Sequence, residues 1–227
     1  MVNRWVTFDC YGTLVDWLSG MRTALDAVGV NEDDREELLA VYQVQEMVVK
    51  ARGWQTYREI LEVGLNQASK ITGVHLGPND AATVAEAWGD WPVFPDVPDA
   101  MQALRDNGWK PVILTDGDDE FWERTKLELT FDFDKVITSN GAGGFKPDLA
   151  PYHRFRKEID GSDIWVHAAN SWIHDMLPTA RLGIPSVWLD RDQTGHPDGL
   201  ADRHIYDATS LPAALADLME AGPKAKR

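Results

Sequence analysis

Four polar residues stand at or near the ends of short apolar segments and offer groups that chemistry could use. Asp9 ends "RWVTFD", Thr115 ends "KPVILT", Lys146 lies in "GGFKPD" and Asp175 closes "ANSWIHD". With Gly12 and Thr13 turning the chain after the strand, Asp9 can point its carboxylate into a crevice while its neighbours are buried. Taken singly, each residue is typical of a helix cap, a turn or a solvated surface. Their combination and order therefore carry the functional signal.

The segments that must position these residues alternate between strand-like and helical patterns. The expected strands are residues 4–9, 110–115, 134–139, 164–169 and 185–190, and the expected helices are residues 98–107, 119–129, 149–159 and 175–182. This alternation predicts an α/β fold with a Rossmann-like parallel sheet covered by helices on both faces. Ligands of such sheets bind beyond the carboxyl ends of the strands. Asp9, Thr115 and Asn170 all stand at those ends.

Residues 16–91 break the alternation, because they contain helical patterns and no convincing strand. The segment "WPVFPDVP" that follows is punctuated by prolines and suits a linker. We therefore expect a four-helix cap domain over residues 16–93, inserted into a catalytic core formed by residues 1–15 and 94–227.

The composition disfavours several classes of function. The 227 residues carry a formal net charge of −15, which argues against nucleic acid or an anionic membrane as partner. The single cysteine, Cys10, excludes an internal disulfide and a cysteine-based zinc site. His167, His174 and Asp190 match no metal-ligand spacing, so no metal and no cofactor is expected. With no signal peptide and no apolar run long enough to span a bilayer, we expect a cytoplasmic protein.

In this order, "FDCYGT", "ILT", "FKPD" and "ANSWIHD" resemble the four motifs of the haloacid dehalogenase superfamily. The resemblance covers the whole chain, including a helical cap inserted after the first motif. It implies that Asp9 is a covalent nucleophile, that Thr115 hydrogen-bonds the reacting anion or the nucleophile, and that Lys146 neutralises negative charge. It also implies that Asp175, or His174 beside it, places or activates a hydrolytic water.

Tyr11 separates two branches of that superfamily. The phosphatases of the superfamily share an aspartate at this position, which protonates the leaving alkoxide. They also share carboxylates in the fourth motif, which hold magnesium. This chain has Tyr11 and Asn170 at those positions, and so resembles the type II 2-haloacid dehalogenases, whose halide leaving group needs no proton. The resemblance implies that Asp9 displaces halide from a short (S)-2-haloalkanoate through an aspartyl ester, giving a 2-hydroxy acid.

The substrate-binding side departs from that branch. The cap segment "AVYQVQEMV" lacks the arginine that grips substrate, and Asp116 replaces the usual asparagine of the second motif. Asp116 either caps the following helix, which "DGDDEF" favours, or faces the site. In the second case an ammonium-bearing substrate such as azetidine-2-carboxylate becomes attractive, opened by the same Asp9 attack. The candidate substrate-binding residues are Tyr11, Asp116, Asn170, Tyr57, Trp172 and His174.

Three alternatives to a dehalogenase remain open. They are the same covalent chemistry on another carbon–heteroatom bond, a non-catalytic binding protein on this scaffold, and a magnesium phosphatase. The retention of Asp9, Thr115, Lys146 and Asp175 disfavours the binding protein, because functional decay would change these residues first. The expected partner is a small molecule, a short 2-substituted carboxylic acid, and the resemblance implies a homodimer through the cap helices.

Overall fold

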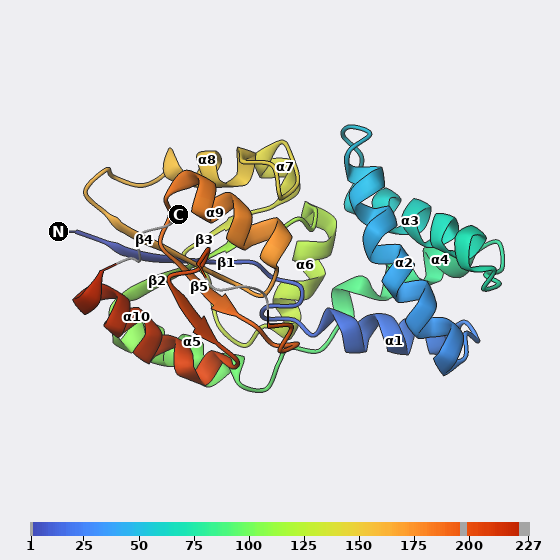
Figure 1. Ribbon diagram of the computed structural model, residues 1–227, viewed down its shortest axis with the longest axis horizontal. Coiled ribbons are helices and arrows are strands. Elements are labelled where there is room, and N and C mark those ends of the chain that lie inside the picture. The colour runs from blue at the N-terminus through green and yellow to red at the C-terminus, as the bar shows by residue number, and fades with distance from the viewer. Residues whose placement is uncertain (1, 196–198, 223–227) are drawn as a thin grey trace. The chain divides into compact units, whose positions relative to one another are not determined.

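The computed structural model describes residues 2–195 and 199–222, and this part of the chain contains a six-stranded parallel sheet (Figure 1). The strands are β1 (Arg4–Phe8), β2 (Trp109–Leu114), β3 (Lys135–Ile137), β4 (Ile164–Ala169), β5 (Ser186–Leu189) and β6 (Arg203–Ile205). Their order across the sheet is β3-β2-β1-β4-β5-β6. The predicted α/β class is therefore confirmed. Because β1 lies between β2 and β4, the residue that follows β1 stands at the middle of the sheet edge.

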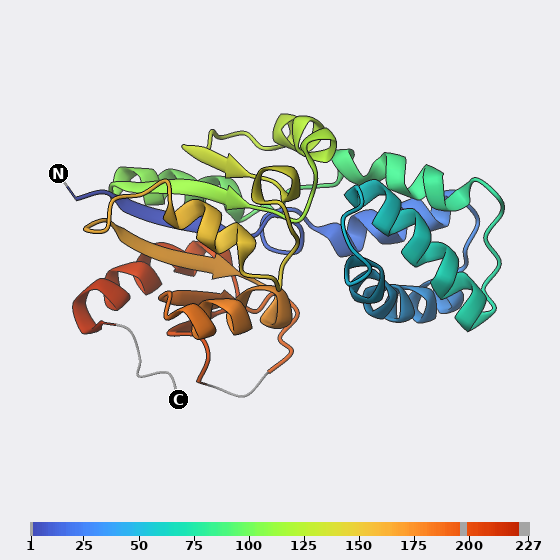
Figure 2. The same cartoon turned by 90° about the horizontal axis from the view of Figure 1, so that it is seen from above.

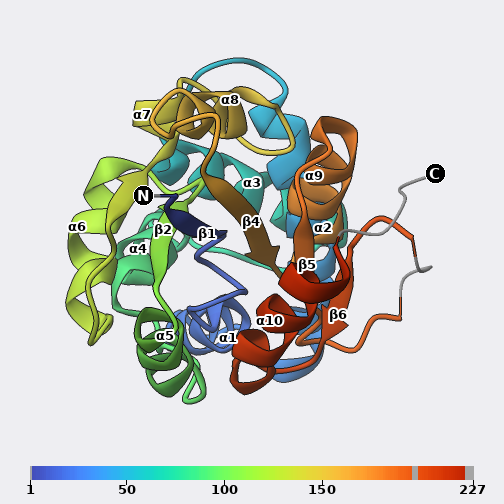
Figure 3. The same cartoon turned by 90° about the vertical axis from the view of Figure 1, so that its left-hand side faces the viewer.

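Helices cover both faces of this sheet. One face carries α5 (Val97–Asp106) and α10 (Leu211–Ala221), and the other carries α8 (Ala150–Arg156) and α9 (Leu177–Leu182) (Figure 3). With both faces covered, strand residues are buried in near-continuous runs, as in β2, where five of the six residues are buried.

The face covered by α8 holds an apolar core. Trp5 of β1 packs edge-to-face on Phe155 of α8, with ring centroids 5.9 Å apart, and Phe155 packs in the same way on Trp165 of β4. Side chains alternate between the two faces of a strand, so Thr7 shares this face with Trp5. His167 of β4 is the direct partner of Thr7 across the sheet. The apolar layer therefore gives way to polar side chains toward the carboxyl ends of β1 and β4.

Four elements have no counterpart among the predicted ones. They are the strand β6, the four-residue helix α7 (Ser139–Ala142), the short helix η3 (Ala208–Ser210) and the helix α10. β6 reads "RHI" and holds a single apolar residue, whereas β3, also three residues long, reads "KVI". By contrast, "LPAALADLMEA" in α10 carries a readable helix signal, since Pro212 lies in the first turn.

Contacts divide the chain into two compact units. One comprises Met1–Asp16, Val93–Asp116 and Leu129–Arg227 and contains the sheet, and the other comprises Trp17–Pro92 and Gly117–Glu128. The second unit is helical (Figure 2) and contains α1 (Trp17–Ala27), α2 (Glu32–Lys50), α3 (Tyr57–Thr72), α4 (Asp80–Glu86), η1 (Ala87–Asp90) and α6 (Asp119–Glu128). The predicted domain boundaries stay a prediction; they assign α6 to the core, whereas its contacts lie within the helical unit.

Asp118 explains why α6 belongs with the helical unit. Its Oδ1 accepts a hydrogen bond from the backbone N of Phe121 at 3.1 Å, which caps α6, and its Oδ2 accepts one from the backbone N of Tyr57 at 3.0 Å. The rings of Tyr57 and Phe121 also pack around Trp88, at centroid distances of 4.9 and 5.8 Å. One carboxylate and one aromatic cluster thus join α3, η1 and α6.

Within residues 2–195 and 199–222, no helix has the length and hydropathy that crossing a membrane requires.

Candidate active site

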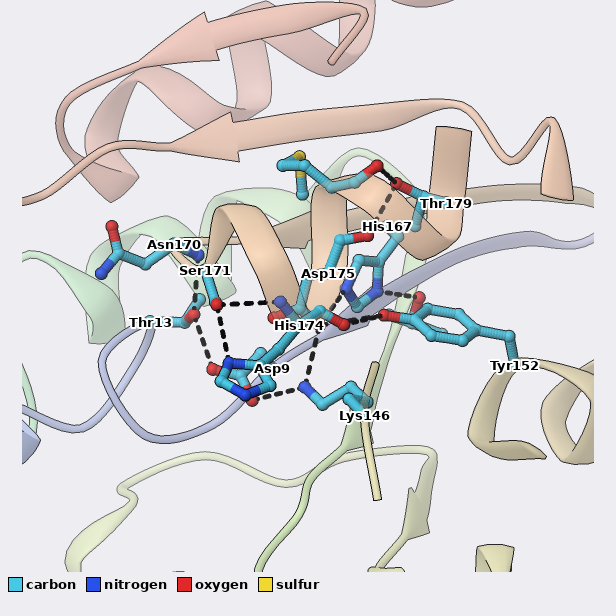
Figure 4. A network of polar contacts seen from close by, with 12 residues as sticks. Asp9, Thr13, Lys146, Tyr152, His167, Asn170, Ser171, His174, Asp175 and Thr179 are labelled. Carbon is cyan, nitrogen blue, oxygen red and sulfur yellow. Dashed lines mark hydrogen bonds and ion pairs between the residues drawn. The ribbon is translucent and has the colours of Figure 1, made fainter. Parts of the chain in front are cut away.

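A lysine lies between two carboxylates at the centre of the site (Figure 4). Lys146 Nζ is 2.6 Å from Asp9 Oδ1 and 2.8 Å from Asp175 Oδ1. Asp9 is 8% exposed, whereas Lys146 and Asp175 are 1% and 0% exposed. Buried ions persist only when they are paired and hydrogen-bonded, as these are. The structure therefore brings together three of the four predicted catalytic residues, in an arrangement that keeps one negative charge in excess.

A tight turn after β1 holds Asp9. Gly12 adopts a φ of 90°, which favours glycine, and the backbone N atoms of Leu14 and Val15 both donate to the Cys10 carbonyl. This turn returns the chain so that the Thr13 hydroxyl donates to Asp9 Oδ2 at 3.0 Å.

Thr13 also links the first motif to the fourth. Its Oγ1 accepts a hydrogen bond at 3.0 Å from the backbone N of Asn170, directly after β4. Thr13 is fully buried. It is missing from the predicted site residues, although its position four residues after Asp9, behind a turn glycine, is a signal that could have identified it.

Asp175 lies in a π-helical turn, η2 (Trp172–Met176), that follows β4. Its Oδ1 accepts three hydrogen bonds: from Lys146 Nζ at 2.8 Å, from Tyr152 Oη at 3.0 Å and from His167 Nε2 at 3.0 Å. Its Oδ2 is buried and has no hydrogen-bond partner among the described residues. Widened turns of this kind are frequent at functional sites. Here the turn directs the Asp175 carboxylate inward, with three hydrogen bonds on Oδ1 and none on Oδ2 among the described residues.

The two carboxylates differ in the direction of their pKa. For Asp9, burial together with the charges of Asp175 and Asp116 outweighs the attraction of Lys146 and raises the pKa. For Asp175, burial acts in the same sense, but Lys146 and His167 outweigh it and lower the pKa. The two groups titrate as a pair, and a proton added to the pair goes first to Asp9.

Lys146 stays charged in this surrounding. Burial disfavours its ammonium, but the carboxylates of Asp175 and Asp9 outweigh that cost and raise the pKa of Lys146. Its position is fixed by the loop before α8, and the peptide bond from Lys146 to Pro147 is cis.

Thr115, the fourth predicted catalytic residue, directly follows β2 and is 2% exposed. Its backbone N donates to the Ile137 carbonyl of β3 at 3.0 Å. The register of β1 and β2 pairs Phe8 with Ile113, so Asp9 and Thr115 leave the sheet at the same edge. A direct role of Thr115 toward Asp9 or the substrate stays a prediction.

Asp116 faces the third motif. Its Oδ1 accepts a hydrogen bond from the backbone N of Lys146 at 2.8 Å, and its charge contributes to the raised pKa values of Asp9 and Lys146. Asp118 accepts a hydrogen bond in the first turn of α6, and the helix-capping role expected for Asp116 stays a prediction. A third carboxylate therefore stands beside the charge-paired centre.

Asn170 holds a neighbouring loop with its side chain. Its Oδ1 accepts from the backbone N of Arg191 at 3.1 Å, and its Nδ2 donates to Asp192 Oδ2 at 3.2 Å. Figure 4 shows this side chain extending away from Lys146. Only the backbone of Asn170 is joined to the nucleophile turn, through Thr13.

The other predicted substrate-binding residues of the sheet unit occupy two places. Tyr11 is half-buried in the turn after β1. Trp172 packs edge-to-face on Trp188, with centroids 4.9 Å apart. His174 Nδ1 is 3.0 Å from Ser171 Oγ, while its Nε2 is buried without a partner among the described residues. Their binding roles stay predictions.

Tyr57 belongs to the helical unit. It is 5% exposed, and its hydroxyl donates to Glu46 Oε1 at 2.5 Å. Lys50 Nζ is 2.7 Å from the same oxygen and lies 5.1 Å from the centre of the Tyr57 ring. The phenol is thus part of a polar cluster inside that unit, and its predicted role toward a substrate stays a prediction.

The donor atoms at the site do not fit a magnesium ion. The Lys146 ammonium lies between Asp9 and Asp175, 2.6 and 2.8 Å from their Oδ1 atoms. Asn170 supplies no carboxylate, and its amide is engaged with the loop at residues 191 and 192. Among the described residues, no cluster of three or more His, Cys, Asp or Glu side chains is arranged to hold a metal.

Comparisons with known proteins show the family of this chain. The sequence model of the haloacid dehalogenase-like hydrolases matches residues 4–166. The (S)-2-haloacid dehalogenase of Pseudomonas sp. (strain YL) is 23% identical over 229 residues, which cover 98% of this chain and 97% of that protein.

Solved structures share the fold. The crystal structure of the L-2-haloacid dehalogenase RSc1362 superposes with a TM-score of 0.81 at 19% identity, covering 95% of this chain and 100% of that one. The L-2-haloacid dehalogenase from Xanthobacter autotrophicus with chloropropionic acid covalently bound superposes with a TM-score of 0.77 at 18% identity, covering 95% and 99%. The family match spans most of the sheet and two of the three residues of the charged centre. The chain belongs to the haloacid dehalogenase-like hydrolases.

Proposed function

We propose that this hydrolase is a 2-haloacid dehalogenase that acts on short (S)-2-haloalkanoates through a covalent ester on Asp9. One observation carries the proposal: a buried carboxylate at the end of β1 is held by Lys146 at 2.6 Å, and Tyr11 stands where a phosphatase needs an acid. The names of the similar proteins support the carbon–halogen bond as the target, and the covalent adduct in the Xanthobacter enzyme supports the ester.

In the first half-reaction an oxygen of Asp9 attacks C2 of the substrate. A carbon–oxygen bond forms, the carbon–halogen bond breaks, and the halide leaves with the bonding electrons. Lys146 and Thr13 restrict the carboxylate to one orientation through one hydrogen bond to each oxygen. Such positioning can supply roughly 7–11 kcal/mol of the reduction in barrier. Since halide departs as an anion, the tyrosine at position 11 costs this reaction nothing.

In the second half-reaction water attacks the carbonyl carbon of the Asp9 ester. Asp175 takes the proton from that water, and Oδ2 is its free acceptor. When the tetrahedral intermediate collapses, the bond between the carbonyl carbon and the alkyl oxygen breaks. The leaving alkoxide takes a proton back from Asp175, which gives the 2-hydroxy acid. The second proton of the water leaves Asp9 for solvent, which restores its carboxylate. The water oxygen remains in the Asp9 carboxylate.

Asp116 favours a second candidate substrate class. With Asp9, Asp175 and Asp116 against one Lys146, the described site carries two excess negative charges, which oppose a substrate carboxylate. A substrate that also bears an ammonium group would offset this charge. Ring opening of azetidine-2-carboxylate uses the same Asp9 attack, with the ring nitrogen as leaving group.

Substrate turnover distinguishes these candidates. The purified protein is incubated with (S)- and (R)-2-chloropropionate, with azetidine-2-carboxylate and with nitrophenyl phosphate, each with and without EDTA. We expect chloride release from the (S)-isomer that EDTA does not change. Turnover of azetidine-2-carboxylate alone would move the assignment to the second class. Nitrophenol release that EDTA abolishes would overturn the proposal in favour of a phosphatase.

A further inference from the structure

A buried hydrogen-bond chain runs behind Asp175, on the side opposite the free oxygen of its carboxylate. Trp165 Nε1 is 2.8 Å from Thr7 Oγ1, Thr7 Oγ1 is 2.9 Å from His167 Nδ1, and His167 Nε2 is 3.0 Å from Asp175 Oδ1. Thr7, His167 and Asp175 are each 0% exposed, and Trp165 is 7% exposed. None of these contacts is required by the fold, since apolar side chains could fill the same space.

The donor in each step of this chain follows from the chemistry of the groups when His167 is neutral. Trp165 Nε1 can only donate, so Thr7 Oγ1 accepts from it. An ionised Asp175 can only accept, so His167 Nε2 carries a proton. In a neutral imidazole Nδ1 then accepts, and the Thr7 hydroxyl donates to it at 2.9 Å in preference to the Val166 carbonyl at 3.4 Å. The chain therefore has one direction, from Trp165 to Asp175 Oδ1.

The sheet register creates this alignment. Thr7 and His167 are paired across β1 and β4, and Trp165 precedes His167 by two residues on the same face. The rings of Tyr152 and His167 meet edge-to-face, with centroids 5.4 Å apart. Tyr152 and His167 thus approach the same oxygen of Asp175 from neighbouring positions.

We propose that His167 is a positioning residue for ester hydrolysis. Oriented by Thr7, His167 donates the third hydrogen bond to Asp175 Oδ1, so that Oδ2 remains as the acceptor for the hydrolytic water. This inference rests on the proposed function. Without His167, Oδ1 would keep only Lys146 and Tyr152 as donors, and the carboxylate could rotate to share both of its oxygens with them. Asp9 makes none of the contacts of this chain, so its attack on the substrate should not depend on His167.

The first test separates the two half-reactions. In rapid-quench single turnover with (S)-2-chloropropionate, mass spectrometry follows the formation and decay of the Asp9 ester in His167→Leu and His167→Gln. We expect ester formation within about threefold of the wild type in both variants. Ester decay should slow about 10- to 100-fold in His167→Leu. The amide of His167→Gln keeps a donor near the Nε2 position and should restore most of the decay rate.

The pH profile gives a readout that a purely structural role would not change. The groups that face Asp175 are Lys146, Tyr152 and His167, with the charges of Asp9 and Asp116 nearby. Losing one donor raises the pKa of Asp175, so its ionised fraction falls at a higher pH. The acid limb of ester decay should therefore move to higher pH in His167→Leu and stay in place in His167→Gln.

Thr7 provides a matched pair that leaves the histidine in place. Thr7→Val removes the hydroxyl that fixes the ring, at nearly constant volume, while Thr7→Ser keeps it. We expect slower ester decay in Thr7→Val and wild-type decay in Thr7→Ser. Equal slowing of both half-reactions in His167→Leu, or unchanged ester decay in His167→Leu and Thr7→Val, would overturn the proposal.

A measurement without substrate tests the role of His167 independently of the proposed function. Carboxyl NMR titration of the ligand-free protein should place the Asp175 midpoint at higher pH in His167→Leu than in the wild type, and ring-nitrogen shifts should show a proton on His167 Nε2. If the wild type forms no ester from any substrate, the proposed function fails. An unchanged Asp175 midpoint would refute the role of His167 whatever the substrate.

Discussion

The surroundings of Asp9 and of Asp175 differ, although both carboxylates share Lys146. Asp9 accepts one further hydrogen bond, from Thr13 in the turn after β1, and remains 8% exposed. Asp175 lies in a π-helical turn, is 0% exposed and has three donors on a single oxygen. Asp9 is thus hydrogen-bonded through both oxygens and keeps a small exposure to solvent. Asp175 is hydrogen-bonded through Oδ1 only.

This difference in surroundings matches the two roles that we propose, nucleophile for Asp9 and base for Asp175. Their pKa values move in opposite directions, upward for Asp9 and downward for Asp175, although one ammonium serves both. Pairs of like groups that are driven apart in this way are typical of acid–base and nucleophilic sites. The role of each carboxylate must therefore come from the partners that it does not share.

The largest effect on activity is expected at Asp9. Asp9→Asn removes the proposed nucleophile, and we expect halide release to fall by on the order of 10⁴-fold or more, with no ester formed. Halide release and intact-protein mass are the measurements. Asp99→Asn changes an exposed carboxylate of α5 and serves as control, with activity unchanged. Substantial halide release by Asp9→Asn would show that the comparison assigns the nucleophile to the wrong carboxylate.

At the second carboxylate the effect should fall on one step. Asp175→Asn keeps the shape but loses the base, and we expect ester hydrolysis to slow roughly 10²- to 10⁴-fold. The ester on Asp9 should then accumulate to near one per chain, and mass spectrometry after mixing with substrate will detect it. Rapid decay of the ester in this variant would mean that another group, such as His174, handles the water.

The shared cation should matter for stability. Lys146→Met leaves two buried carboxylates unpaired, and we expect a loss of about 3–5 kcal/mol in unfolding free energy at neutral pH. Lys146 lowers the pKa of Asp175, so that stabilisation is present above the unfolded pKa and is lost as pH falls. The difference between wild type and variant should therefore shrink toward acidic pH.

Urea unfolding across that pH range measures this change. Lys126→Met, which alters a lysine whose side chain is 41% exposed, is the control and should change stability little at any pH. A Lys146→Met variant as stable as the wild type at neutral pH would contradict the charge-paired centre.

The smallest effects on rate are expected at the hydroxyl groups that bind only one of the two carboxylates. Thr13→Val removes the hydroxyl bonded to Asp9, and Tyr152→Phe removes the one bonded to Asp175. Each loss is worth about 1–3 kcal/mol, or roughly 5- to 150-fold in rate. Single-turnover kinetics should show slower ester formation in Thr13→Val and slower ester decay in Tyr152→Phe. The reverse assignment, or both steps slowed in both variants, would remove the distinction between the two carboxylates.

Much of the sheet could be predicted, because strand and helix patterns alternate clearly. The five predicted strands are present, each within two residues of its expected bounds, and β6 was missed because "RHI" holds a single apolar residue. Asp9, Lys146 and Asp175, which the motifs singled out, lie together in the structure, since residues at the carboxyl ends of parallel strands converge. Their catalytic roles stay predictions. The homodimer implied by the resemblance stays a prediction.

The partners of the charged centre could not be predicted from the motifs. Tyr152 and His167 approach Asp175 through a helix and a strand whose patterns look like ordinary core. His167 carried no metal-ligand spacing, and only the register with Thr7 shows what it contacts. The hydrogen bond of Asp116 with the distant backbone N of Lys146 could not be read from the local sequence.

The central claim is that Asp9 forms an ester that water cleaves at its carbonyl carbon. A single turnover of (S)-2-chloropropionate in heavy-oxygen water, followed by proteolysis and mass spectrometry of the peptide that contains Asp9, tests it directly. We predict that one heavy oxygen enters the Asp9 carboxylate and that the first molecule of 2-hydroxy acid carries none. Heavy oxygen in the product hydroxyl with an unlabelled Asp9 peptide would contradict the covalent mechanism.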